Sequence, residues 1–229
     1  MSYLGSTKIG QMFLGSVEIG KAYLGADLVF QKGGTPPTPP TPSRLPEGYT
    51  EVEYIENTST ARINTGISGN STWTLVAKLV TADSTTPVLF GRDTGGGHYF
   101  GSIPSVSHKW GVGGSSGQYV STSALVKTTI VITVTSNKNF SGTINGETFA
   151  RQASTNKSAN FFLFNASTGA NYPFLGRLYG DAVCVKSGVE VFRGVPCTNP
   201  NGVAGLYDLV GNSFKGSSNS ATFTAGPAI

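Results

Sequence analysis

The phrase Tyr3-Leu4-Gly5-Ser6 returns as Phe13-Leu14-Gly15-Ser16 and again as Tyr23-Leu24-Gly25-Ala26, so one ten-residue unit occurs three times. A fixed period of this kind indicates internal repetition. Glycine accepts positive φ, and the aromatic and β-branched residues of each unit suit a pleated strand. Each unit therefore predicts a short strand, a turn and a second short strand.

These repeated strands need a partner to cover them. Neighbouring residues of a strand point to opposite faces, so each aromatic–leucine pair places a large apolar group on both faces. A segment this short cannot bury enough apolar surface to offset the ordering of its own chain. We expect copies of the segment around a symmetry axis, or a groove on another protein, to cover it. The alternative is a disordered, glycine-rich tail. The predicted assembly residues are Tyr3, Leu4, Ile9, Phe13, Leu14, Ile19, Tyr23 and Leu24.

The composition suits many short strands and argues against several classes of partner. Charged residues make up 12% of the 229 residues, which is about half the usual share, while glycine is abundant. The net charge of +4 is spread without a basic run, so no nucleic-acid partner is predicted. No apolar stretch is long enough to span a membrane, and residues 1–34 lack the pattern of a signal peptide. We expect synthesis in a cytoplasm and release within assembled particles.

The two cysteines, Cys184 and Cys197, are predicted to stay reduced. If Ser187-Gly188 is the turn of a tight hairpin, Cys184 lies opposite Val191 and Cys197 opposite Leu178. That register holds the two sulfur atoms well apart. We therefore expect both cysteines to act as small buried hydrophobic residues.

The composition also divides the chain into three parts. Residues 1–32 hold the repeats, residues 33–44 form a Gly/Thr/Pro-rich linker, and residues 45–229 form one domain. Proline fixes φ and removes donors, so the linker predicts an extended polyproline II spacer, either a stalk or an ordinary solvated connection.

The domain predicts an all-β sandwich or jelly roll without helices, because short strand patterns alternate with turn residues. Asn145-Gly146 is the strongest hairpin signal. The nearly continuous apolar run at 129–134 predicts a strand buried on both faces. The predicted strands are 51–55, 61–67, 72–80, 88–92, 98–101, 109–112, 119–120, 127–135, 140–144, 147–150, 161–164, 174–185, 189–196, 203–210 and 221–225.

Both ends of the domain resemble a known group of proteins. The sequences LPEGYTEVEYIE at 45–56 and ARINTG at 61–66 resemble the opening of concanavalin-like (laminin-G-like) jelly rolls in tailed-bacteriophage virion proteins. The sequences LYGDAV at 178–183, GVAGLYD at 202–208 and FTAGP at 223–227 resemble the closing strands of the same group. The repeated phrase is similar to an N-terminal repeat of phage fibre and decoration proteins.

The resemblance implies a virion location and a short head or tail fibre. It implies an oligomer, expected to be a trimer, held by the repeats and bound to other virion proteins of the capsid or tail. The concanavalin-like jelly-roll sandwich would then be projected toward cell-surface glycans. Fold likeness alone leaves function open, so a glycan hydrolase and a ligand-free decoration protein remain alternatives.

One acidic motif bears on the hydrolase alternative. Glu51-Val-Glu53-Tyr-Ile-Glu56 is similar to the Glu-x-Asp-x-x-Glu strand of concanavalin-like glycosidases. A retaining pair of carboxyl groups must lie about 5–5.5 Å apart. An offset of five places Glu51 and Glu56 on opposite faces of a strand unless a bulge intervenes. We therefore predict no catalytic residue and expect solvated glutamates on an outer strand.

A glycine-rich turn supplies the predicted glycan site. In Asp93-Thr-Gly-Gly-Gly-His98-Tyr99, carbonyl groups and a carboxylate can converge on a calcium ion or a sugar, although a plain turn explains the same residues. Tyr99 and Trp110 can stack on sugar rings if they are exposed, and otherwise belong to the core. The predicted glycan-binding residues are Asp93, His98, Tyr99 and Trp110. His98 and His108 lack further ligands nearby, so no metal or cofactor is predicted.

Overall fold

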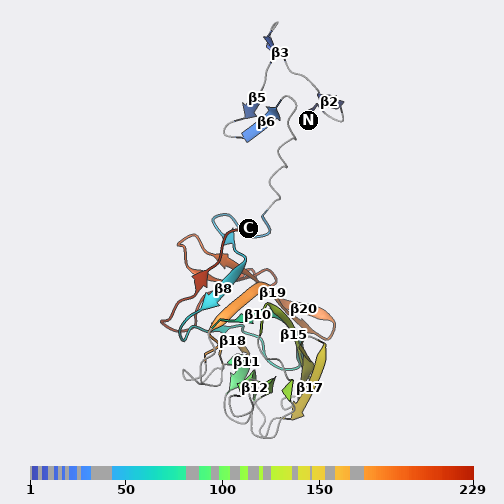
Figure 1. The fold of residues 1–229 in the computed structure, drawn as a ribbon, viewed down its shortest axis with the longest axis vertical. Coiled ribbons are helices and arrows are strands. Elements are labelled where there is room, and N and C mark those ends of the chain that lie inside the picture. Colours follow the sequence, from blue (N-terminus) through green and yellow to red (C-terminus); the bar gives the residue numbers. More distant parts are fainter. Residues whose placement is uncertain are drawn as a thin grey trace. The chain divides into compact units, whose positions relative to one another are not determined.

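The computed structural model divides the chain into two units, residues 1–44 and 45–229. Every described element is a β-strand, which confirms the predicted all-β class for the described residues (Figure 1). That part of the chain therefore holds no helix of the length and hydrophobicity that a membrane crossing needs. The described residues are 43–80, 88–93, 98–103, 109–112, 119–120, 125–135, 139–144, 146–152, 158–165 and 173–229, together with six short strands within 2–31. The proline-rich stretch 33–42 lies outside them.

The repeats of the first unit form antiparallel pairs of strands, as the strand–turn–strand pattern predicts. Two residues separate the strands of each pair. The strands are β1 (Ser2–Leu4) with β2 (Thr7–Ile9), β3 (Phe13–Leu14) with β4 (Val17–Glu18), and β5 (Lys21–Leu24) with β6 (Asp27–Gln31).

The second unit contains two antiparallel sheets. The larger sheet follows the order β17-β16-β15-β10-β19-β20-β21-β22; in addition, β7 is paired with β20, β8 with β19, and β23 with β8. Its strands are β7 (Thr50–Glu51), β8 (Tyr54–Asn57), β10 (Ser71–Leu79), β15 (Thr128–Val134), β16 (Asn139–Ile144), β17 (Glu147–Gln152), β19 (Gly176–Lys186), β20 (Val189–Thr198), β21 (Ala204–Asp208), β22 (Ser213–Lys215) and β23 (Thr224–Ala225).

The smaller sheet follows the order β14-β13-β12-β11-β18-β9. Its strands are β9 (Ile63–Asn64), β11 (Val88–Asp93), β12 (His98–Ile103), β13 (Lys109–Val112), β14 (Tyr119–Val120) and β18 (Phe162–Leu163). Aromatic rings join the two sheets: Phe100 of β12 lies 5.3 Å from Phe149 of β17 between ring centroids. This arrangement is that of a β-sandwich.

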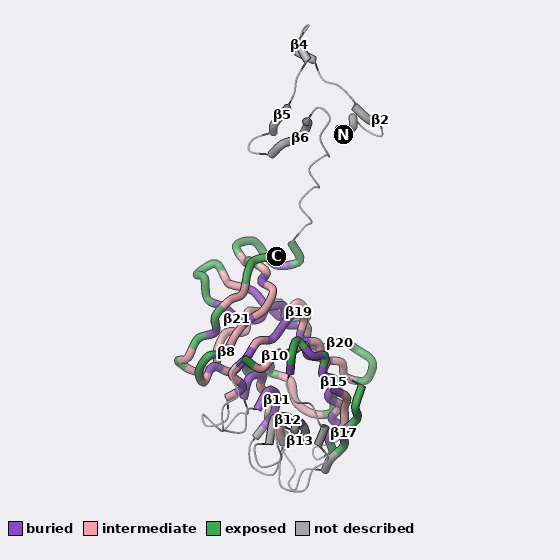
Figure 2. Tube along the Cα trace, in the orientation of Figure 1, coloured by how far each residue is buried: buried purple, intermediate pink, exposed green. Residues whose placement is uncertain are grey.

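Trp73 of β10 occupies the centre of the core. Its side chain is fully buried, and its ring lies 5.2 Å from Phe90 of the opposite sheet and 5.6 Å from Phe192 of its own sheet. Its indole Nε1 donates a 3.1 Å hydrogen bond to Ser71 Oγ, so the polar atom of the ring is satisfied. Figure 2 shows the buried residues concentrated along these central strands. Trp73 thus links the two sheets at the centre of the core.

Strand β15 corrects one prediction. Thr128, Ile130, Ile132 and Val134 are buried, whereas Thr129 is exposed and the residues between are half-buried. The strand therefore buries one face and not two, because the larger sheet is covered on one side only at this point. Because the half-buried outer residue Val131 is also apolar, the sequence does not show the alternation of buried and outer side chains along this strand.

The two ends of the second unit lie side by side. Thr224 and Ala225 of β23 are paired with Glu56 and Ile55 of β8. The contact continues beyond the strand, because Glu53 N donates to Pro227 O at 2.9 Å. The last residues thus add a strand to the segment with which the domain begins.

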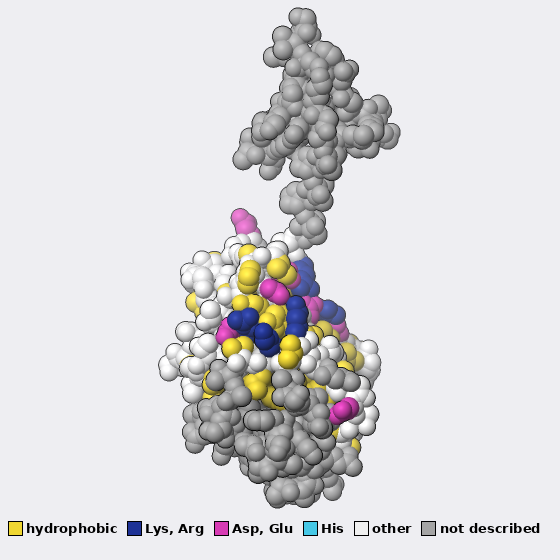
Figure 3. Space-filling model, viewed as in Figure 1, with side chains coloured by type: hydrophobic (Ala, Val, Ile, Leu, Met, Phe, Trp, Pro, Cys, Tyr) yellow, Lys and Arg dark blue, Asp and Glu magenta, His cyan; other side chains and the backbone are white. Residues whose placement is uncertain are grey.

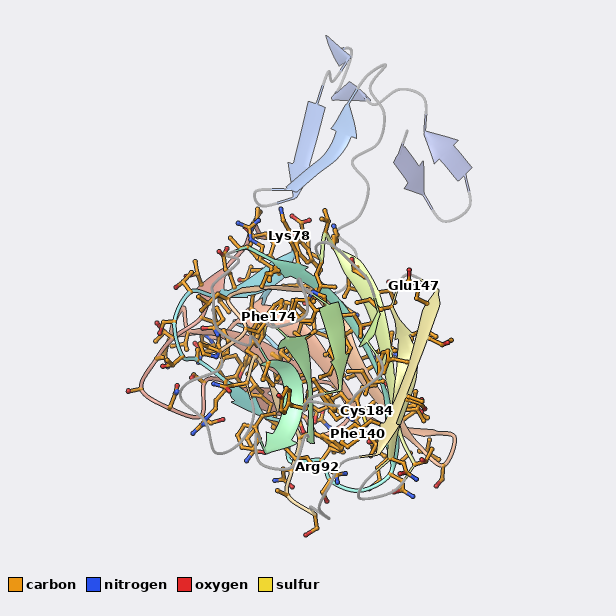
Figure 4. The ribbon with its side chains drawn as sticks, turned by 60° about the horizontal axis from the view of Figure 1, so that its bottom comes forward. Lys78, Arg92, Phe140, Glu147, Phe174 and Cys184 are labelled. Carbon is orange, nitrogen blue, oxygen red and sulfur yellow. The ribbon has the colours of Figure 1, made fainter. Side chains whose placement is uncertain are left out.

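Both cysteines are reduced and buried, as predicted. The predicted register was wrong: Cys184 lies opposite Phe192 because a bulge follows it. Cys197 lies opposite Gly205 on β21, and Leu178 is paired with Ile55 of β8. Burial raises the pKa of both thiols to about 12, so they stay neutral at physiological pH. Figure 4 places Cys184 in the interior of the domain.

Replacing Trp73 with alanine tests the central packing. Trp73→Ala should lower the free energy of unfolding of the second unit by about 3–5 kcal/mol, because a large cavity would remain between the sheets. Urea unfolding followed by far-UV circular dichroism measures this loss. The control Thr129→Ser, on the exposed face of β15, should change it by less than about 0.5 kcal/mol. A loss of the same size in both variants would contradict the central role of Trp73.

Candidate functional site

The predicted glycan loop joins two strands of the smaller sheet. Asp93 ends β11 and His98 begins β12, and the two residues lie opposite each other in the ladder. Tyr99 lies opposite Gly91 and is half-buried. Residues 94–97 lie outside the described residues, as do the side chains of Asp93 and His98. The strands therefore bring three of the four predicted residues to one hairpin.

Trp110, the fourth predicted glycan residue, belongs to the core. Its side chain is 1% exposed and its ring centroid lies 5.9 Å from that of Phe100, in a stacked arrangement. Phe174 meets it edge-on at 5.9 Å. Both neighbours occupy the surface that a sugar ring would need. The prediction that Trp110 stacks on a sugar is therefore wrong for this structure, and the alternative of a core residue holds.

The acidic motif does not form the single outer strand that was expected. Glu51 ends β7, Glu53 lies between β7 and β8, and Glu56 lies on β8, which is paired with both β19 and β23. The Glu53 side chain is 44% exposed, whereas that of Glu56 is 15% exposed. Glu56 accepts a 2.8 Å hydrogen bond from Arg177 Nε, and Glu53 lies 3.1 Å from Lys127 Nζ. These two carboxylates are thus each neutralised by a cation.

The same cations cover two tyrosine rings on the outer face of the larger sheet. The rings of Tyr54 and Tyr179 lie 5.1 Å apart between centroids. The Arg177 guanidinium lies 4.2 Å from the centre of the Tyr54 ring, and Lys127 Nζ lies 4.7 Å from that of Tyr179. Hydrogen bonds with Tyr179 and Glu56 raise the pKa of Arg177 further above its ordinary value.

We call these six residues the outer-face cluster: Glu53, Tyr54, Glu56, Lys127, Arg177 and Tyr179. Figure 3 shows Lys and Arg side chains gathered with hydrophobic and acidic ones over the region of β8 and β19. Gly226 lies against the Tyr54 ring, since a Cβ there would come within 2.8 Å of it. The cluster therefore fastens β8 and the C-terminal segment to β19. In the sequence, the cluster is visible only as aromatic and charged residues at alternate positions, 54 and 56 on β8 and 177 and 179 on β19. Sequence reasoning did not identify it.

A second ion network lies farther along the same face. Arg193 of β20 donates through Nη1 to Asp181 at 2.8 Å and through Nε to Glu190 at 2.8 Å. The hydrogen bond from Arg193 lowers the pKa of Glu190. The network joins β19 to β20 beside the bulge.

Arg92 is a fully buried cation that sequence reasoning also missed. Its Nη2 donates to Gly69 O at 2.8 Å, and its guanidinium lies 4.1 Å from the centre of the Phe161 ring. Burial lowers its pKa to about 10, so it remains charged at neutral pH. These contacts tie β11 to the loop before β10, and Figure 4 shows Arg92 at that end of the domain.

The predicted assembly residues occupy matching places in the three hairpins. Tyr3, Phe13 and Tyr23 lie opposite positions 8, 18 and 28, respectively. The leucine after each aromatic lies opposite the first residue of the second strand. Ile9 ends β2, whereas Ile19 lies outside the described residues. Seven of the eight predicted residues thus belong to described strands.

Comparisons with known proteins add no family assignment. No family model and no curated protein matches this chain.

Within the described residues, no group of three or more His, Cys, Asp or Glu side chains is placed to hold a metal ion. The candidate sites therefore depend on the geometry given above.

The pH dependence of stability tests the Arg193 network. A carboxylate with a lowered folded pKa stabilises the fold above its unfolded pKa, and this stabilisation disappears as pH falls through the folded value. Glu190→Gln should therefore cost about 0.2–1 kcal/mol at neutral pH and progressively less as pH falls below the ordinary range of glutamate.

Chemical denaturation at a series of pH values measures this difference. The control is Glu147→Gln, on the exposed hairpin of β16 and β17. A difference between Glu190→Gln and the unmodified chain that persists unchanged at low pH would contradict the assignment.

Proposed function

We propose that this chain is a structural protein of a tailed-phage virion, a short head or tail fibre without enzymatic activity. Its repeats assemble copies of the chain, as a trimer, and attach them to other virion proteins of the capsid or tail. Its second unit is a concanavalin-like jelly roll that is projected by the proline-rich linker. The resemblance of both domain ends and of the repeated phrase to phage virion proteins supports this proposal.

The observation that carries the proposal is the matching register of the three hairpins. In each, an aromatic residue and a leucine precede a two-residue connection, and the leucine lies opposite the first residue of the next strand. An isolated two-stranded hairpin is at best marginally stable in water. Because all three hairpins share this register and carry large apolar residues, we infer that neighbouring chains cover them.

The acidic motif supports a role without catalysis. A retaining glycosidase needs one free carboxylate as nucleophile and one protonated carboxyl as acid. Glu56 is engaged by Arg177 at 2.8 Å and Glu53 by Lys127 at 3.1 Å. These contacts occupy carboxylates of the motif, so they support a structural role for it.

Attachment to a host glycan is the role we propose for the second unit. The hairpin that carries Asp93, His98 and Tyr99 supplies the contact, and several copies on one fibre raise a weak single-site affinity by avidity.

Truncation tests the assembly role. The full chain should have a solution mass that is a multiple of its own, whereas a chain that begins at Leu45 should be a monomer. The second unit has its own extensive core, so the truncated chain should remain folded. Light scattering coupled to size exclusion measures both masses, and circular dichroism checks folding. A monomeric full chain, or an oligomeric truncated one, would contradict the proposal.

A further inference from the structure

Two aromatic residues lie on the outer face of the smaller sheet. Phe162 of β18 is paired with Gly91 of β11, and Gly91 is paired in turn with Tyr99 of β12. Directly opposite residues of an antiparallel pair share a face, so the three positions form one row across neighbouring strands (Figure 1). We call Phe162, Gly91 and Tyr99 the aromatic row. Because Gly91 has no side chain, no side chain of β11 stands between the two aromatic residues in this row.

The aromatic row faces away from the core of the domain. Phe90 and Phe100, the neighbours of Gly91 and Tyr99 along the chain, are fully buried in the core. Successive residues of a strand point to opposite faces, so the row lies on the other side of the sheet. Phe162 and Tyr99 are accordingly half-buried. Single exposed apolar residues are common, but two aromatic residues in one row form a surface on which a ligand can stack.

A polar side chain of β9 lies at one end of the aromatic row. Asn64 is paired with Phe162 and is exposed. Its Oδ1 accepts hydrogen bonds from Gly66 N at 2.9 Å and from Asn160 Nδ2 at 3.3 Å. These two bonds fix which way the amide group points. Because the oxygen atom is engaged by the protein, Asn64 Nδ2 is the atom that can donate to a ligand.

Arg62 places further hydrogen-bond donors beside the same ring. Its guanidinium lies 5.7 Å from the centre of the Phe162 ring. The backbone of this part of β9 is held from its outer edge, because Ser218 N donates to Arg62 O at 2.7 Å and Asn64 N donates to Ser218 Oγ at 2.9 Å. The surface therefore combines aromatic rings with donors whose positions are fixed before a ligand arrives, which lowers the cost of binding.

We propose that the aromatic row, together with Arg62 and Asn64, is the glycan-binding site of the second unit. A sugar ring stacks on Phe162, and its hydroxyl groups accept hydrogen bonds from Arg62 and Asn64. The inference rests on the proposed attachment to a host glycan and names the surface that makes the contact. A sugar ring has an apolar face of C–H groups and a rim of hydroxyl groups, which matches an aromatic ring flanked by donors.

The length of the aromatic row indicates the size of the ligand. Phe162 and Tyr99 lie on strands two apart in the sheet, which corresponds to about 9.6 Å. A glycan that contacts both residues therefore has more than one sugar unit. Tyr99 belongs to the hairpin that also carries Asp93 and His98, so the row continues the contact already proposed for that hairpin.

Removing the Phe162 ring tests the stacking contact. The unmodified full chain is applied to a microarray of bacterial surface polysaccharides, and a short oligosaccharide of the polysaccharide that it binds is then titrated by calorimetry. Phe162→Ala should lower the affinity for this oligosaccharide about tenfold, because the loss of a central aromatic contact commonly has an effect of this size. The matched control Phe214→Ala removes a half-buried ring from β22 of the larger sheet and should leave the affinity unchanged.

Replacing the amide of Asn64 tests the polar contact separately. Asn64→Asp keeps an oxygen atom for Gly66 N and removes the donor Nδ2, so the affinity should again fall about tenfold. The matched control is Asn199→Asp, in the loop between β20 and β21. Asn199 Oδ1 likewise accepts a backbone hydrogen bond, from Val203 N at 2.9 Å, so the same change of charge is made away from the aromatic row. This control should bind normally.

The possible outcomes separate this inference from the proposed function. If the unmodified chain binds no polysaccharide of the array, glycan attachment and this inference both fail. If it binds and either Phe162→Ala or Asn64→Asp binds equally well, only the assignment of the site to the aromatic row is overturned. A loss of affinity in the controls as large as that in the variants overturns the assignment as well. Urea unfolding of each variant shows that the second unit remains folded.

Discussion

The absence of an interior in a two-stranded hairpin is the constraint on which this account depends. Each repeat has two strands of two to five residues, and its sequence predicts large apolar residues on both faces. Such a unit cannot remove these residues from water by folding on itself. We therefore propose that neighbouring chains cover each hairpin and supply its stability.

The second unit removes its apolar side chains from water within its own fold. Trp73 buries its ring among aromatic residues of both sheets, and paired ends close the domain where β23 adjoins β8. The outer-face cluster then holds β8 against β19 through Arg177 and its carboxylate partner. The second unit has an extensive core of its own, and we propose that the repeats depend instead on neighbouring chains.

Much of the fold could be predicted from the sequence, because turn residues and short apolar patterns mark the strands. The strands at 109–112 and 119–120 have their predicted bounds, and the hairpin at 145–146 joins Ile144 directly to Glu147 in the register. The segment 51–55 breaks into β7 and β8 because the chain passes from a partner on β20 to one on β19. Strand β22 was missed because Ser213–Lys215 carries only one apolar residue.

The sites were harder to predict, since they depend on long-range contacts. No local pattern reveals that Trp110 meets Phe174, or that Arg92 lies under Phe161. The repeats could be recognised without a structure, because their ten-residue period and strand–turn–strand pattern are visible in the sequence.

Hydrogen exchange of residues 2–31 tests the central claim most directly. The account predicts slow exchange in the assembled protein and fast exchange in single copies at high dilution. Slow exchange in an isolated single copy would contradict it.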